Sequence, residues 1–89
     1  MRYSVARLCG GKALMTSPRE AVEVNIEEAV KILSESGNVA KIDDMMLVMS
    51  WKGMEVTLYS QGKIMFHPLD DRNVAISHSN EILTLLRVI

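Results

Sequence analysis

The sequence predicts an α+β fold: a curved antiparallel sheet of about four to five strands, with two helices on one face. The first observation behind this prediction is a set of short segments in which apolar and polar residues alternate, separated by turn residues. The second is a pair of longer segments, 25–37 and 70–89, whose apolar residues recur every three or four positions. With 89 residues and 48% hydrophobic content, residues 1–89 are expected to form one domain with a packed core.

The N-terminal sequence predicts one strand, but it does not decide the secondary structure of residues 18–24. Residues 2–8 alternate as a strand does, and Gly10 and Gly11 then break or sharply bend it. Extended structure resumes over residues 12–15 in this interpretation. Residues 18–24 fit a short helical turn that begins with proline, but their two valines alternate as they would in a strand. Both alternatives stay open for this segment.

The first helix is predicted from its capping residues. Asn25 is a favourable N-cap residue three positions before Glu28, and apolar residues follow at helical spacing. Gly37 is the expected left-handed cap at the C-terminal end. After this helix, residues 39–42 predict an edge strand, and the dense apolar run 45–51 predicts a central strand.

The strongest strand signal is a β-hairpin over residues 54–67. Apolar residues alternate with other side chains on both sides of the turn 60–63. Gly62 can take the positive φ that such a turn commonly requires, without a Cβ penalty. A two-residue connection precedes the hairpin, so residues 45–67 are expected to form a three-stranded meander. The hairpin side chains expected in the core are Val56, Leu58, Ile64 and Phe66.

The last helix is expected after Pro68, which ends the preceding strand because proline cannot donate to a β-ladder. Asp70 or Asp71 is the expected N-cap, where a carboxylate also suits the helix dipole. The expected apolar stripe of this helix consists of Val74, Ala75, His78, Ile82, Leu85, Leu86 and Ile89. The polar residues placed outside that stripe are Ser77, Ser79, Asn80 and Glu81.

Two stretches within this order of elements resemble one half-repeat of the TATA-box-binding protein family. They are residues 24–30, with the sequence VNIEEAV, and residues 56–65, with the sequence VTLYSQGKIM. The corresponding hairpin of the family has an apolar strand ending in Phe-Ser-Ser-Gly-Lys, followed by an apolar strand and an acid-capped helix. The resemblance implies the fold of one half of the family's saddle, in a chain with one repeat where the family has two.

The resemblance implies less about function than about fold. The family grips the minor groove of DNA with apolar contacts and phenylalanine wedges. Tyr59 occupies the position at which the family's hairpin has a phenylalanine, and Asp44 lies near the position of the family's second wedge phenylalanine. Arg7 falls about where the family has an asparagine that reads base edges. Because a carboxylate repels phosphates, the implied fold carries over to this chain better than the implied DNA chemistry does.

The overall charge argues against a nucleic-acid partner. Ten Lys and Arg residues against eleven Asp and Glu residues give a net charge of −1, without the broad positive field that captures phosphates. Cys9 is the single cysteine, which excludes an internal disulfide and CxxC-type zinc binding. The sequence has no signal-like segment and no membrane-spanning apolar run, so we expect a cytoplasmic protein without a membrane partner.

The sheet face opposite the helices is the candidate binding surface. Cations, a phenol and an imidazole on one face fit an anionic or planar ligand. The simpler interpretation is that any half-solvated antiparallel sheet displays such residues outward. By alternation, the ligand-binding candidates on this face are Arg7, Thr57, Tyr59, Lys63, Met65 and His67, joined by Ser50.

The sequence predicts no catalytic constellation, no metal site and no cofactor. Cys9 has no base placed near it, His67 is a lone exposed imidazole, and His78 is expected at the core edge with a satisfied nitrogen. Asp43 and Asp44 are assigned to a turn. The leading hypothesis is a small non-enzymatic binding or assembly module, whose partner is a second copy, another protein or a small anionic ligand. The alternatives are a nucleic-acid-binding homodimeric saddle and a small enzyme whose site forms across a dimer.

Overall fold

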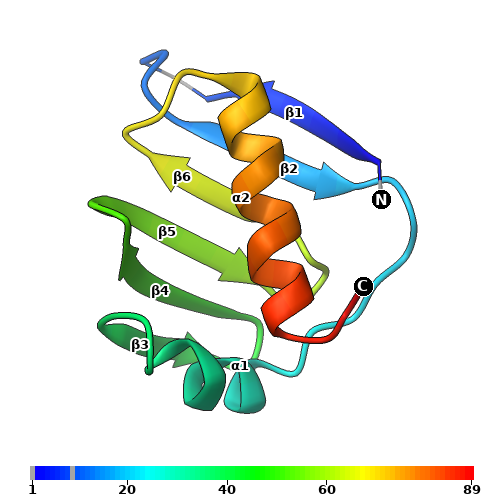
Figure 1. Cartoon of the computed structure of the whole chain (residues 1–89), viewed down its shortest axis with the longest axis vertical. Coiled ribbons are helices and arrows are strands. Elements are labelled where there is room, and N and C mark those ends of the chain that lie inside the picture. The colour runs from blue at the N-terminus through cyan, green and yellow to red at the C-terminus, as the bar shows by residue number, and fades with distance from the viewer. Residues whose placement is uncertain (1, 9) are drawn as a thin grey trace.

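The computed structural model describes residues 2–8 and 10–89, and it shows one antiparallel sheet with two helices packed on one of its faces (Figure 1). The order of the strands in the sheet is β1-β2-β6-β5-β4-β3. The predicted α+β class is confirmed, and the sheet has six strands where about four to five were predicted. The elements are β1 (Tyr3–Arg7), β2 (Leu14–Pro18), α1 (Ile26–Leu33), β3 (Val39–Asp43), β4 (Met46–Trp51), β5 (Met54–Tyr59), β6 (Ile64–His67) and α2 (Arg72–Leu85).

The additional strand is β2, which lies between β1 and β6. The turn after β1 contains Gly10 and Gly11, both with positive φ, so the predicted break becomes a hairpin. Leu14 of β2 then pairs with Phe66 of β6, far along the chain. After Pro18 the chain forms neither helix nor strand until α1 begins, which resolves the segment that the sequence left open.

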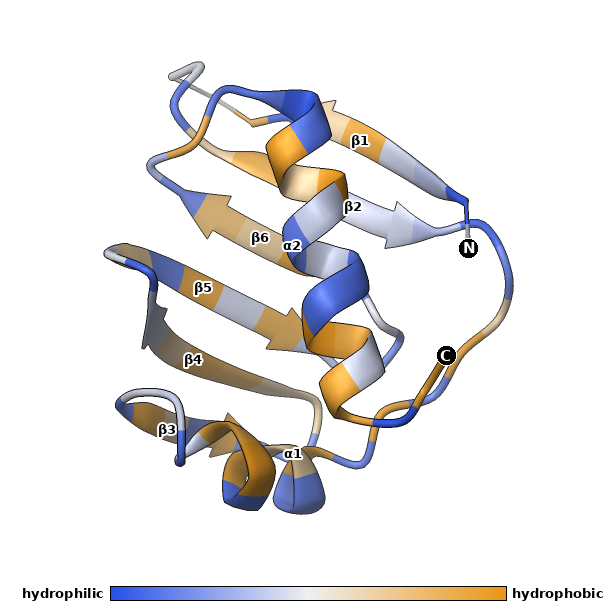
Figure 2. Ribbon diagram, in the orientation of Figure 1, coloured by the Kyte–Doolittle hydropathy of each residue, from blue (hydrophilic) through white to orange (hydrophobic). Residues whose placement is uncertain are grey.

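The core lies between the sheet and the helices. Cross-strand partners Leu14, Phe66, Val56 and Met49 form one row of buried side chains across four strands. The predicted burial of Val56, Leu58, Ile64 and Phe66 is confirmed, because each of them has no exposed surface. Hydrophobic residues run along β4, β5 and β6 and recur on both helices (Figure 2). The helical side chains buried in this core are Ile26, Ala29 and Leu33 of α1 and Ala75, Ile82 and Leu83 of α2.

Helix α1 begins as predicted and ends differently. The Asn25 side chain accepts a hydrogen bond from the Glu28 N–H at 3.1 Å, which confirms the N-cap. The helix ends at Ser34 in a right-handed conformation, so the prediction that Gly37 is a left-handed cap is wrong. Gly37 has a different role. A Cβ at this position would collide with the backbone carbonyl oxygen of Ser50, so only glycine lets the chain pass this close to β4.

Helix α2 is capped by Asp71, whose carboxylate accepts from the N–H groups of Asn73 and Val74. The predicted stripe of this helix is partly wrong: Ser79 is fully buried, whereas Leu85 is 43% exposed. The reason is that α2 crosses β1 and β2, where the facing side chain is the hydroxyl of Thr16. Ser79 meets that hydroxyl at 2.5 Å, so the helix turns a polar residue inward.

Candidate functional site

The sheet face opposite the helices, called the open face here, carries a row of mostly apolar side chains. In an antiparallel sheet, directly paired residues point to the same face, so the cross-strand pairs trace this row from one edge to the other. It contains one residue from each of the six strands. We call it the apolar row, and in spatial order it consists of Ala6, Met15, Met65, Thr57, Val48 and Ala40.

A row of mostly polar side chains flanks the apolar row on each side, two residues away along the strands. The lysine row contains Lys63, Tyr59 and Met46, in which the Tyr59 N–H donates to the Lys63 carbonyl at 2.9 Å. The glutamate row contains His67, Glu55 and Ser50, which are consecutive cross-strand partners. The two flanking rows are four residues apart along the strands, which is about 13 Å of extended chain. The Lys63 ammonium and the Glu55 carboxylate therefore lie at opposite borders of the apolar row.

The centre of the open face is covered by its own side chains. Thr57 is only 2% exposed although no helix lies over it, and its neighbours Met65 and Val48 are half-buried. The apolar row is therefore a packed surface rather than a set of isolated side chains. Towards β3 the face is hollowed by a cavity of about 560 Å³, which is lined by residues 38–40, 48–50 and 53–55.

Most of the side chains predicted for the open face lie there, with one exception. Alternation places Thr57, Tyr59, Lys63, Met65 and His67 on it together with Ser50. Arg7 lies on the opposite face, so its predicted position is wrong. It pairs with the buried Leu14, and its guanidinium donates to the carbonyl oxygens of Gly11 at 3.0 Å and Asp70 at 3.4 Å. The physical reason is strand parity, because Arg7 is in phase with Tyr3 and Val5, which face the core.

Sequence reasoning missed several residues of the open face, among them Val48, Glu55 and Met15. Val48 and Glu55 could have been found from alternation, since Val48 is in phase with Ser50 and Glu55 with Thr57. Met15 could not have been found in this way, because the sequence did not establish where β2 lies in the sheet. With Met15 included, the apolar row runs unbroken from β1 to β3.

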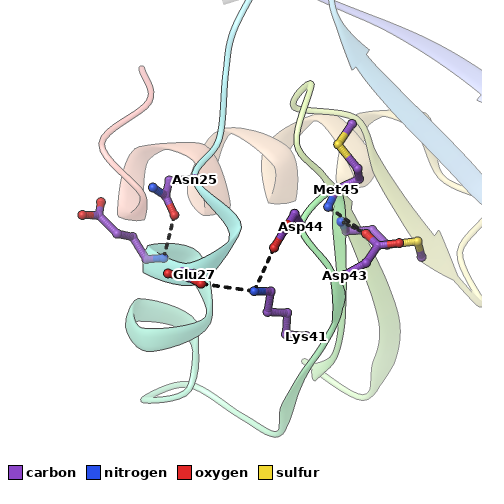
Figure 3. Close-up of polar contacts among 8 residues, drawn as sticks. Asn25, Glu27, Lys41, Asp43, Asp44 and Met45 are labelled. Atoms are coloured by element: carbon purple, nitrogen blue, oxygen red, sulfur yellow. Dashed lines mark hydrogen bonds and ion pairs between the residues drawn. The ribbon is translucent and has the colours of Figure 1, made fainter.

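A separate polar cluster joins α1 to β3 (Figure 3). The Lys41 ammonium lies 3.0 Å from the Asp44 carboxylate and 3.3 Å from that of Glu27. Hydrogen bonds to Asp44 and then to Glu27 raise the pKa of Lys41. Asp43 accepts from the N–H groups of Met45 and Met46 at 2.7 and 3.1 Å, which confirms the predicted turn role. These contacts are exposed to solvent, so they fix the loop more than they stabilise the fold.

An aromatic cluster lies between α2 and the sheet, and it contains a histidine whose buried ring nitrogen has no hydrogen-bond partner among the described residues. The His78 imidazole packs edge-on against Trp51 at 5.0 Å between ring centroids and tilted against Phe66 at 5.9 Å. Its Nδ1 is buried without a hydrogen-bond partner in the described part of the chain, so the predicted satisfied nitrogen is wrong. Burial, and secondly the nearby Lys52, lower the pKa of His78, whereas Glu81 opposes this shift.

The described residues contain neither a cluster of metal-ligating side chains nor a helix that could span a membrane. Across residues 2–8 and 10–89, no three His, Cys, Asp or Glu side chains gather as metal ligands would. The helices found there are all too short or too polar to cross a bilayer. Cys9 lies outside the described residues, so its predicted lack of a base stays a prediction.

Comparisons of the chain with protein-family models, characterised proteins and solved structures give no match. The resemblance to a half-repeat of the TATA-box-binding protein family therefore stays a prediction.

Proposed function

We propose that this protein is a non-enzymatic binding and assembly module that recognises another protein surface through its open face. The observation that carries the proposal is the apolar row, which crosses all six strands on the face that the helices leave uncovered. Contiguous apolar surface on a small soluble domain commonly marks a contact surface. The protein then binds its partner by burying the apolar row against the partner's surface.

The arrangement of the open face matches the anatomy of a protein–protein interface. Such interfaces have an apolar, well-packed centre with methionine and aromatic residues enriched, surrounded by a polar rim. Here Met15, Met65 and Val48 form the centre, and the lysine and glutamate rows form the rim. Tyr59 adds an aromatic ring with a polar tip at the border between centre and rim.

The charges of the open face favour a protein over a small anion. With Arg7 on the other face, Lys63 is the permanent cation of the flanking rows, and Glu55 in the opposite row carries the opposing charge. A phosphate or carboxylate ligand is commonly held by several converging donors. Lys63, immediately before β6, and His67, at the end of β6, instead lie four residues apart at different borders of the apolar row.

The proposal is tested by site-specific photo-cross-linking in the host cell. A photoreactive phenylalanine analogue replaces Val48, in the apolar row, and in a matched control it replaces Ser77, which is exposed on α2. We expect a discrete adduct from position 48, none from position 77, and loss of the adduct when Met65→Lys is added. Adducts of equal intensity at both positions, or no adduct at position 48, would contradict a binding role for the open face.

A further inference from the structure

We infer that the partner of the open face is a second copy of this chain, packed face to face about a two-fold axis that runs along the apolar row. This inference rests on the proposed binding role of the open face and names its occupant. Three observations support it: the symmetry of the rows, the placement of the charges and the size of the face.

The rows of the open face are arranged as a two-fold axis requires. A rotation by 180° about the apolar row lays that row on itself and exchanges the lysine row with the glutamate row. Met65 then faces Met65 of the partner subunit, and Thr57 faces Thr57 of the partner subunit. Such an isologous contact uses the same patch on both copies and closes without leaving an open end. Two sheets packed in this way lie about 10 Å apart.

The charges are complementary under the same rotation. Lys63 comes to lie across from His67 of the partner subunit, and one strand away from Glu55 of the partner subunit, because β6 and β5 are neighbours. Neighbouring strands lie about 4.8 Å apart, which is within reach of a lysine side chain. Glu55 lies across from Tyr59 of the partner subunit, so the carboxylate is placed between a phenol and an ammonium.

A two-fold axis parallel to the strands is less favourable. That rotation would lay the lysine row on itself and the glutamate row on itself. Lys63 and Glu55 of the partner subunit would then stay about 13 Å apart along the strands, beyond the Debye length of about 8 Å at physiological salt. The position of the charges therefore selects the axis along the apolar row.

The open face is large enough for a stable dimer. The molecule measures 30 × 27 × 20 Å, and Figure 1 looks down the shortest of these axes onto the plane of the sheet. The two longer dimensions give a face on the order of 800 Å², which is about one partner's share of a standard-size interface. Face-to-face packing of the whole sheet is therefore in the range of specific dimers.

The first measurement is the mass of the purified chain by light scattering and sedimentation equilibrium. We expect twice the chain mass of 10.0 kDa at micromolar concentration, and half of that mass in Met65→Lys. A monomer at about 100 μM would overturn this inference. It would leave the proposed function standing if the position-48 adduct in cells contains a different protein, so the two failures are distinguishable.

The second measurement is a charge swap that tests the axis. Glu55→Lys and Lys63→Glu each bring like charges together across the two-fold axis, and we expect each to raise the dimer dissociation constant by about tenfold or more. The double variant Glu55→Lys/Lys63→Glu restores the attraction, so its dissociation constant should return to within about threefold of the natural protein. Glu35→Lys, in the exposed turn after α1, is the matched control and should change nothing.

The charge-swap experiment can also overturn the proposed two-fold axis. Unchanged dimerisation in both single variants, or equal weakening in the single and double variants, would exclude contact between Lys63 and Glu55 across the axis. Circular dichroism of each variant checks that the fold is retained. Because both side chains are at the solvent-facing border of the sheet, their reversal should leave the core intact.

Discussion

The imidazole of His78 couples the packing of this protein to pH. In the folded chain it lies against Trp51 and Phe66 with its Nδ1 buried, and its pKa is lowered from 6.5, first by burial and secondly by Lys52. In the unfolded chain these causes are absent, so the unfolded state binds the proton more readily. The folded state is therefore most stable above pH 6.5, where the imidazole is neutral in both states, and its free energy of unfolding decreases as the pH falls below that value.

We predict that the melting temperature falls between pH 7 and pH 5 and that His78→Gln makes this fall smaller. The measurement is thermal unfolding followed by circular dichroism at a series of pH values. Ser77→Gln is the matched control, because Ser77 is exposed on the same helix and carries no titratable group, so the pH dependence should stay as in the natural protein. If His78→Gln retained the full fall, the buried imidazole would not be the group responsible.

At the scale of the elements, a pair of buried hydroxyls sets how α2 lies on β2. Thr16 and Ser79 meet at 2.5 Å with no exposed surface, and the Thr16 hydroxyl also lies 3.5 Å from the Ile64 carbonyl oxygen. A buried hydroxyl without a partner is costly, whereas removing both partners together can be nearly neutral. The pair therefore favours one rotation of the helix over others that would bury Leu85 instead.

We predict unequal and non-additive effects for variants of this pair, measured by urea unfolding. Thr16→Val leaves the Ser79 hydroxyl without its partner and should cost about 1–3 kcal/mol. Ser79→Ala should cost less, because Thr16 still has the Ile64 carbonyl oxygen. The double variant should be more stable than the sum of the two single effects implies. Strictly additive costs would show that the two hydroxyls do not interact in solution.

At the scale of the whole molecule, the distribution of charge leads us to predict that DNA is not a partner. The net charge is −1, Arg7 is tied to carbonyl oxygens on the helix-covered face, and Glu55 lies on the open face. Tyr59 offers one ring at a position where groove wedging uses apolar insertion. Kinking a duplex costs several kcal/mol, which has to be recovered from contacts and released counterions.

We predict no duplex-DNA binding tighter than ~10 μM at physiological salt, which is weak even among non-specific interactions. The measurement is a titration of labelled AT-rich duplex over a series of salt concentrations. Tyr59→Ala serves as the comparison variant and should behave like the natural protein. Submicromolar binding with a steep salt dependence that Tyr59→Ala abolishes would favour the nucleic-acid alternative instead.

Features that depend on neighbours in the chain could be predicted from the sequence. The 54–67 hairpin follows from period-two alternation around Gly62, whose φ is +90°. The start of α1 follows from the Asn25 side chain, and the start of α2 from that of Asp71. In each case the stabilising contact joins residues a few positions apart, so the local residue types contain the necessary information.

Features that depend on contacts between distant residues required the folded chain. β2 was not placed because its partner in β6 lies about fifty positions later, and without it neither Met15 nor the continuous apolar row was visible. Ser79 is inside rather than Leu85 because Thr16 faces α2. Apolar spacing along a helix indicates that one side is buried, but the partner surface selects which side, since a buried hydroxyl needs another polar group to meet it.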